Sequence, residues 1–320
     1  MRTSPAKRQP YLLPTLKRLN PGNYKIKKHA KSFYLAQLFL RNKDCQKIKD
    51  LYELCRLIDD TADDQNLSNE NALKKLQQFE AIIQETSKNN IIAITDQLHI
   101  KTYGLLKLIE GMKSDRQHKQ PTCLQELITY CYQAAGTVGL MICDAMKIDE
   151  QRAKDHAICL GIAMQITNIT RDIWEDALNQ RVYLPKSLVG NISPEDILQK
   201  KVNSTLIKKA SKHLLETADL FYHEGNQGLP YIAKENRFAI YLASELYRNI
   251  GIKIALNGHT YAKTRAYCST IDKLLITVGC LKNYYKNRES PAITQADIKK
   301  HAHITFKNAM ESLTCAPTTS

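Results

Sequence analysis

The stretch Gln165-Ile-Thr-Asn168-Ile-Thr-Arg171-Asp172-Ile-Trp-Glu175-Asp176 decides how the rest of the sequence is interpreted. It lies in the run from Gln151 to Leu178, where apolar residues recur every three or four positions, as they do on a helix. Asn168, Asp172 and Asp176 are spaced by four, so a helix carries their oxygen atoms on one face. Carboxylate and amide oxygens are ligands that Mg²⁺ accepts. The stretch therefore predicts a helix with a stripe of possible metal ligands.

A second acidic segment, Tyr52-Glu-Leu-Cys-Arg56-Leu-Ile-Asp59-Asp60-Thr-Ala-Asp63, precedes the first. Asp59 and Asp63 are four residues apart and share a helix face with Arg56 and Tyr52. Two carboxylates one turn apart repel each other, and Mg²⁺ relieves that repulsion. Taken alone, the pattern is more typical of a solvated acidic helix end. The presence of two such helices changes that balance.

If the two acidic helices face each other, they form a mouth for several metal ions and a diphosphate. Arg56, Arg171 and Arg181 could neutralise the phosphate oxygens. Metals and arginines gathered on a diphosphate stabilise the charge that develops as it leaves. A departing allylic diphosphate leaves a carbocation, which needs a closed, apolar cavity. Tyr52, Tyr130 and Tyr247 could face such a cation, although a single aromatic residue on a helix more often packs in a core.

The composition favours a helical bundle. The chain has 320 residues, of which 43% are hydrophobic and 24% are charged, and proline is absent from 22–120 and from 231–290. These values exclude a disordered or fibrous protein, and the proline-free stretches argue against a turn-rich sandwich. No apolar run is long enough to span a membrane. We expect one all-α domain, with later helices over 124–146, 151–178, 195–224, 235–258 and 269–287 and breaks at 181–185 and 190–194.

The net charge of +14 invites a nucleic-acid hypothesis, but only the charge supports it, because no zinc-finger spacing or RNA-binding signature is present. We therefore expect no nucleic-acid partner. The first 28 residues carry no acid, and we predict a basic extended arm over 1–24 that contacts anionic membranes. Nine cysteines without a CxxC pair argue against a disulfide framework or zinc site and indicate a reducing compartment.

At these residues the sequence resembles the squalene/phytoene synthase family. The segment from Tyr52 to Asp63 is similar to the family's first signature, and the segment from Gln165 to Pro185 is similar to its second. Three further segments agree in order along the chain. They are 29–33 with Ser32, the stretch 130–139 with its Ala-Gly-Thr-Val-Gly, and 243–274 with Tyr247 and Arg265.

The resemblance implies an isoprenoid-synthase-type bundle with a central apolar cavity. It implies a catalytic domain over 25–290, followed by a carboxy-terminal helix and loose tail over 291–320. The implied reaction joins two prenyl diphosphates head to head, with Mg²⁺ or, as an alternative, Mn²⁺. By this resemblance the metal ligands are Asp59, Asp63, Asn168, Asp172 and Asp176; the diphosphate contacts are Ser32, Arg56, Arg171 and Arg265; and Tyr52, Arg56, Tyr130, Arg171 and Tyr247 are catalytic.

Several alternatives stay open. Likeness to bacterial phytoene synthases favours two C20 substrates, phytoene as product and no use of NADPH, whereas a C15 substrate would give presqualene diphosphate, squalene or dehydrosqualene. A non-catalytic assembly protein of the same fold is disfavoured, because the acidic residues and arginines are present. We expect a cytoplasmic enzyme in peripheral contact with a membrane, and the sequence leaves its oligomeric state and NADPH dependence undetermined. Asn179-Gln180 departs from the family's more usual Arg-Gly.

Overall fold

The computed structural model describes residues 35–84, 95–261 and 265–286. The basic arm over 1–24, Ser32 and the tail over 291–320 lie outside the described residues, so those predictions stay predictions. The described part contains helices and no strand, which confirms the all-α class. The longer helices are α4 (Asn42–Asp63), α5 (Asn69–Gln84), α7 (Thr102–Arg116), α10 (Gln151–Arg171), α14 (Ser204–Asn226), α15 (Lys234–Leu256) and α16 (Thr270–Lys286).

Shorter helices connect these long ones. The helices α8 (Leu124–Cys131) and α9 (Thr137–Ala145) are joined by one π-helical turn, η1 (Tyr132–Gly136), so the predicted helix over 124–146 is present with a widened middle. The remaining elements are α11 (Ile173–Leu178), α12 (Lys186–Val189), α13 (Pro194–Leu198) and the 3₁₀ turn η2 (Leu229–Tyr231). The predicted break at 181–185 is present, and the one predicted at 190–194 covers only 190–193, because Pro194 begins α13.

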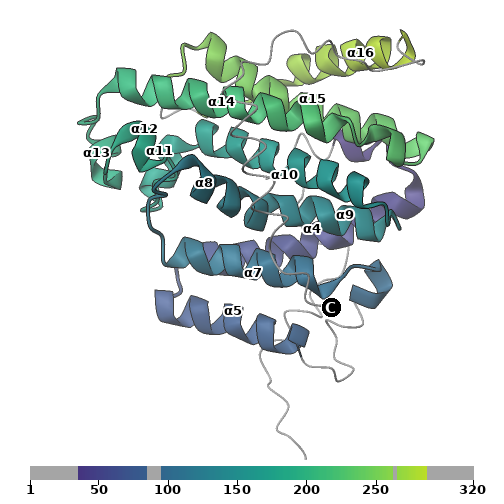
Figure 1. The fold of residues 1–320 in the computed structure, drawn as a ribbon, viewed down its shortest axis with the longest axis horizontal. Helices are drawn as coiled ribbons and strands as arrows, with labels where there is room; N and C mark the ends of the chain where they lie inside the picture. Colours follow the sequence, from purple (N-terminus) through teal and green to yellow (C-terminus); the bar gives the residue numbers. More distant parts are fainter. Residues whose placement is uncertain (1–34, 85–94, 262–264, 287–320) are drawn as a thin grey trace, which may run out of the picture.

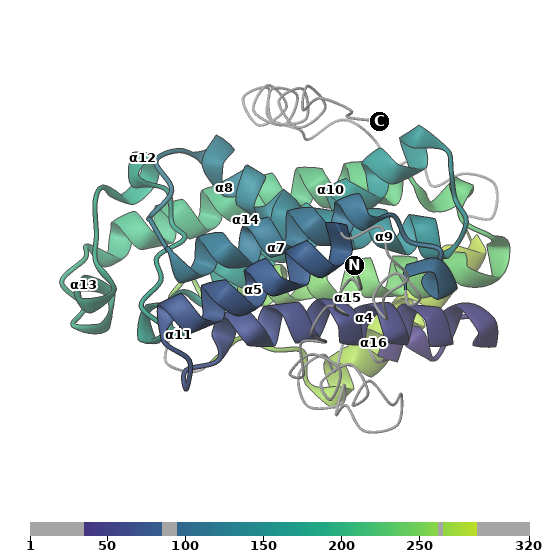
Figure 2. The same ribbon diagram turned by 90° about the horizontal axis from the view of Figure 1, so that it is seen from below.

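Helix α10 lies in the middle of the bundle. It packs against α14 and α15 on one side and against α8, η1 and α9 on the other, and α7 and α5 form the outer layers (Figure 1). Ile162, Ile166 and Ile169 are buried in a core shared with α8 and α14. A second core joins α4, α5, α7 and α9. Figure 2 shows α4 running lengthwise beside α5. The acidic ends of α4 and α10 therefore belong to rigid, packed helices.

Two glycines permit the close approach of α9 and η1 to α10. A Cβ atom on Gly139 would lie 2.2 Å from the carbonyl oxygen of Ala157, and one on Gly161 would lie 2.3 Å from that of Ala135. Only glycine fits where two helix backbones approach so closely. These contacts assign Gly139 to the packing of α9 against α10.

The helix predicted over 195–224 is wrong as a single element. Helix α13 ends at Leu198, Lys200 has a positive φ of 55°, and α14 begins only at Ser204. Asn203 caps α14, because its side-chain oxygen accepts a hydrogen bond from the backbone N–H of Thr205 at 2.9 Å. Ser193 and Asp196 form a capping box for α13. These capping residues favour two helices over one continuous helix.

Candidate active site

The first acidic segment lies in the last turns of α4. The Arg56 guanidinium forms ion pairs with both Asp59 and Asp60, and its Nη2 atom is 2.8 Å from the latter carboxylate. Burial, followed by repulsion from Asp63, raises the pKa of Asp59 to about 7. Burial also raises the pKa of the Tyr52 phenol to about 12. The α4 carboxylates thus crowd one another and share one arginine.

The second acidic segment is interrupted at Asp172, which lies between α10 and α11 with φ −105° and ψ 15°. Its N–H still bonds to the carbonyl oxygen of Asn168 at 2.9 Å, and the N–H of Asp176 bonds to the carbonyl oxygen of Asp172 at 2.7 Å. The predicted spacing of four residues is therefore kept across the interruption. Asp172 is 9% exposed, so its charge needs close partners.

Two arginines supply those partners. Arg171 binds the Asp172 carboxylate through Nε at 2.7 Å and Nη2 at 2.6 Å. Arg265, 93 residues further along the chain, binds the same two oxygens at 2.6 and 2.5 Å, and its Nη1 atom is 3.5 Å from Glu175. The structure thus brings together three residues that the sequence analysis assigned to one site.

Arg181 connects the two acidic segments. It follows α11, and its Nη1 atom lies 2.8 Å from the carboxylate of Asp63 on α4. Burial, followed by the charge of Asp172, raises the pKa of Asp176 well above its usual value. Both observations place the end of α4 and the α10–α11 junction at one mouth, as the sequence predicts.

The oxygen donors at this mouth fit a magnesium ion. The Oδ1 atom of Asn168 is buried without a hydrogen-bond partner, while its Nδ2 atom donates to Gln165 at 3.3 Å. An unpaired buried oxygen is costly, and a cation removes that cost. Across the described ranges, no three His, Cys, Asp or Glu side chains are already gathered around one ion position. Water and substrate oxygens would therefore have to complete the coordination, as Mg²⁺ commonly allows.

The three tyrosines differ in their surroundings. Burial raises the pKa of the Tyr247 phenol, and the charges of Arg171 and Arg265 oppose that rise, while the charge of Arg56 opposes the rise at Tyr52. These two phenols therefore lie beside the mouth. The hydroxyl of Tyr130 is instead held by other side chains. It donates to Asp115 at 3.0 Å, and its ring stacks on that of Tyr183 with the centroids 4.8 Å apart.

Asp115 belongs to neither acidic segment and was not predicted from the sequence. This carboxylate ends α7, is 6% exposed, and has its pKa raised to about 6 by burial, while Arg181 opposes that rise. One signal could have identified it. The buried face of α7 carries Leu105, Leu108 and Met112, and Asp115 continues the same helical spacing. A carboxylate in a core position needs a specific partner.

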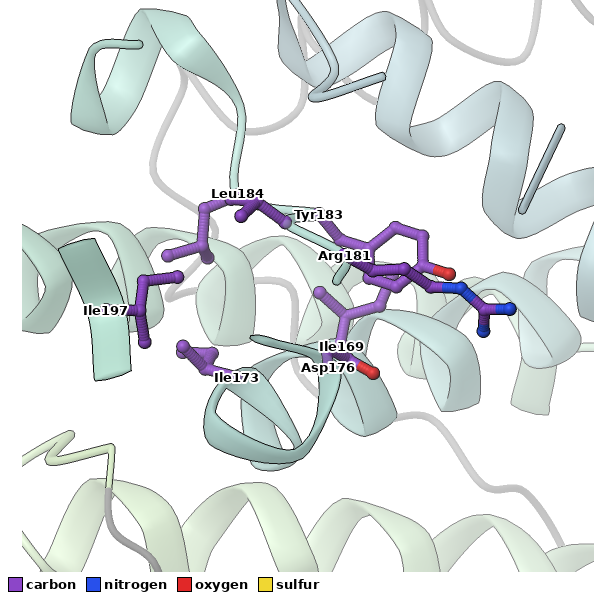
Figure 3. A pocket seen from close by; sticks show the side chains of 8 residues that line it. Ile169, Ile173, Asp176, Arg181, Tyr183, Leu184 and Ile197 are labelled. Atoms are coloured by element: carbon purple, nitrogen blue, oxygen red, sulfur yellow. The ribbon is translucent and has the colours of Figure 1, made fainter. Parts of the chain in front are cut away.

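A small pocket borders the mouth, and its cavity volume of about 10 Å³ is close to the room that one water molecule needs. Figure 3 shows Ile173, Leu184 and Ile197 on one side of it, while the Arg181 guanidinium extends away from them. Ligand sites usually exceed 300 Å³, so this pocket is too small for prenyl chains. The large central cavity remains a prediction. Gln180 precedes Arg181 with a φ of 61°, a conformation that suits the glycine usual in the resembling family.

Comparisons with known proteins agree with this geometry. The model of the squalene/phytoene synthase family matches residues 26–272. A 15-cis-phytoene synthase of Enterobacter agglomerans is 29% identical over 78% of this chain and 90% of its own length. Phytoene synthase 1 of Arabidopsis thaliana is 30% identical over 77% of this chain, which spans 62% of that protein.

Solved structures share the fold. A dehydrosqualene synthase has a TM-score of 0.67 and 26% identity, over 82% of this chain and 94% of its own. The squalene synthase HpnC of Alicyclobacillus acidocaldarius, at 18% identity, matches the fold with a TM-score of 0.65 over 78% of this chain and 95% of its own. With its two acidic helices meeting at one mouth, the chain belongs to the squalene/phytoene synthase family and is an all-α prenyltransferase of that type.

Proposed function

We propose that this chain condenses two molecules of geranylgeranyl diphosphate head to head, through a cyclopropyl diphosphate intermediate, to give phytoene. The observation that carries this proposal is the Arg181–Asp63 ion pair, which joins the two acidic segments into one anionic mouth lined with arginines. The phytoene synthases similar to this chain support the choice of product.

In this proposal Asp59, Asp63, Asn168, Asp172 and Asp176 hold Mg²⁺, with Mn²⁺ as an alternative ion. Bound metal supplies positive charge to the leaving diphosphate. Arg171 and Arg265 already converge on Asp172, and Arg56 lies on the facing helix. As the substrate enters, these guanidinium groups exchange carboxylate oxygens for phosphate oxygens, and we propose that Ser32 adds a further contact. The exchange keeps each cation paired while the diphosphate is neutralised.

The reaction then needs little further chemistry from the chain. The C1–O bond of one substrate breaks, and diphosphate leaves with the electron pair. The double bond of the second substrate attacks C1, and loss of one proton closes the cyclopropane ring. Departure of the second diphosphate drives rearrangement, and loss of another proton gives phytoene. The rings of Tyr52, Tyr130 and Tyr247 stabilise the cations in turn.

A product assay by mass spectrometry tests this proposal. Purified protein with Mg²⁺ receives geranylgeranyl diphosphate or farnesyl diphosphate, each with and without NADPH. Phytoene from the C20 substrate, formed equally without NADPH, is the expected result. A C30 product or presqualene diphosphate from the C15 substrate alone overturns the C20 assignment and favours the squalene branch. The similarity to a dehydrosqualene synthase is the reason for including the C15 substrate. No product from either substrate, with the protein folded, overturns the catalytic proposal.

We further propose that the enzyme is cytoplasmic and contacts an anionic membrane surface through α16. No helix of the described ranges is long and apolar enough to cross a bilayer. Six exposed large apolar side chains nevertheless lie on or just before α16. They are Tyr267, Ile271, Leu274, Leu275, Val278 and Tyr285. Helix α16 carries three lysines, Lys273, Lys282 and Lys286, and one acid, Asp272, which pairs with Lys253. An apolar face with surplus positive charge is typical of helices that lie on anionic lipid.

Vesicle co-sedimentation tests this membrane contact. We expect wild-type protein to bind phosphatidylcholine vesicles that contain phosphatidylglycerol, and the double variant Leu274→Gln/Leu275→Gln to bind much less. Leu206→Gln, a change at an exposed leucine on α14, is the control and should bind normally. Deleting residues 1–20 tests the basic arm separately. Equal vesicle binding by the double variant and the wild type overturns the proposal that α16 contacts the membrane. If the double variant binds vesicles normally but no longer forms a dimer that the wild type forms, the α16 surface contacts a second copy of the chain instead.

A further inference from the structure

One buried carboxylate has no role in the proposed chemistry so far. Asp115, at the end of α7, accepts a hydrogen bond on each oxygen. The Tyr183 hydroxyl donates to Oδ1 at 2.6 Å, and the Tyr130 hydroxyl donates to Oδ2 at 3.0 Å. The two phenol oxygens lie 3.2 Å apart. One carboxylate thus joins α7, α8 and the segment that follows α11.

Residues just after Asp115 hold the same segment by its backbone. The Nε2 atom of His118 accepts a hydrogen bond from the N–H of Val182 at 2.9 Å. The side-chain amide of Gln120 donates to the carbonyl oxygen of Leu184 at 2.9 Å. Residues 181–185, which we call the strap, are therefore tied along their length to the end of α7.

The strap carries Arg181, whose Nη1 atom reaches Asp63 on α4. The Arg181 charge also compensates Asp115, since after burial it has the largest effect on the pKa of that carboxyl and lowers it. Figure 3 shows the Tyr183 hydroxyl and the Arg181 guanidinium extending to the same side of the strap. A substitution at Asp115 should therefore change the positions of both the Tyr183 and the Arg181 side chains.

We infer that Asp115 is a positioning residue for the reaction, and that it acts through Tyr130 and Tyr183. This inference rests on the proposed function for its kinetic consequence. Asp115 fixes both phenols in one orientation and holds the strap where Arg181 can meet Asp63. A phenol that donates to a carboxylate carries more electron density on its ring and oxygen, which strengthens its attraction to a cation. The Tyr130 ring is thereby both held in place and made a better partner for the carbocation.

Steady-state kinetics with single and combined variants test the inference. Asp115→Asn keeps the shape of the side chain but leaves one oxygen to accept from two phenols. We expect kcat to fall about 10–100-fold, because misplaced catalytic groups cost that much, while KM changes little. Tyr130→Phe/Tyr183→Phe should lower kcat similarly, and adding Asp115→Asn to it should lower kcat no further. The inference is overturned if the kcat losses of Asp115→Asn and of the double tyrosine variant multiply in the triple variant. It is also overturned if Asp115→Asn leaves kcat unchanged.

Asp44→Asn is the matched control. Asp44 is also buried, and it accepts hydrogen bonds from Asn236 and Arg41 far along the chain from the strap. If Asp115 serves only stability, both variants should lose stability and both should keep their kcat. We expect only Asp115→Asn to lower kcat in protein that remains folded, as judged by circular dichroism.

A second readout needs no catalysis. In protein labelled with ¹³C at tyrosine Cζ, Asp115→Asn should shift the two resonances that disappear in Tyr130→Phe and Tyr183→Phe, and should leave the other tyrosine resonances in place. Resonances that do not move contradict the hydrogen bonds themselves. Failure of the proposed function would show as no condensation product from wild-type protein, whatever the spectrum of Asp115→Asn. The two failures are therefore distinguishable.

Discussion

At the residue scale, the site is governed by how its charged side chains are paired. Asp172 is held by two guanidinium groups, and Asp63 by a third that comes from a different segment. The two Asp172 pairs offset the cost of removing that carboxylate from water, whereas Asp63 is exposed. The same pairs keep the arginines within reach of an entering diphosphate. The residues that stabilise the mouth are thus the ones proposed to bind substrate.

Replacing Asp172 with Asn should abolish turnover while the helical content stays the same. The change removes a proposed metal ligand and leaves Arg171 and Arg265 without their shared anion. We expect the rate of phytoene formation to fall about 10²–10³-fold or more. Asp155→Asn, on the exposed side of the same helix, should keep its activity. Wild-type turnover in Asp172→Asn would contradict the assignment of Asp172 as a metal ligand.

Asp115 should make stability depend on pH in a definite direction. Its pKa is raised from 3.8 to about 6, so the folded protein holds this proton more tightly than the unfolded chain. The resulting stabilisation is complete below about pH 4 and is lost as pH rises through about 6, with an upper limit of about 3 kcal/mol. Urea unfolding should therefore show wild-type protein losing stability relative to Asp115→Asn over this range. A difference that is constant with pH contradicts the burial of this carboxyl.

At the element scale, periodicity predicted the helices well because their apolar faces are buried. The helix over 235–258 is observed as α15, and that over 269–287 as α16. Local chemistry that overrides periodicity was missed. Asn203 starts a new helix inside a continuous apolar pattern. The π-helical turn at 132–136 was not predicted either, because the apolar spacing continues through it as in an α-helix. The π-helical turn directly follows α8, which carries Tyr130.

The closely packed glycines make a prediction at this scale. Gly139→Ala should destabilise the protein by about 2 kcal/mol or more, because its Cβ atom would meet the backbone of Ala157 at 2.2 Å. Gly279→Ala, on α16 with nothing within 4 Å, should instead stabilise by about 0.5–1 kcal/mol. Denaturant unfolding of both variants checks this contrast. Equal effects would contradict the close approach of α9 and α10.

At the scale of the whole molecule, the sequence predicted that the two acidic segments meet but not which contacts connect them. Two acidic stripes with matching arginines indicated a shared mouth, and the Arg181–Asp63 pair confirms that they meet. Asp115 could not be found from the motifs, because its partners lie 15 and 68 residues away on separate segments. Only folding brings these residues into contact.

The central claim is that both acidic helices act on one metal–diphosphate site. Calorimetric titration of inorganic pyrophosphate in the presence of Mg²⁺ tests it most directly, with wild-type protein, Asp63→Asn and Asp172→Asn. Asp50→Asn, at an exposed position on α4, serves as the control. We predict that the two site variants, on different helices, each weaken pyrophosphate binding about 10-fold or more, and that the control binds as wild type does. Loss confined to one of the two helices would contradict the shared site.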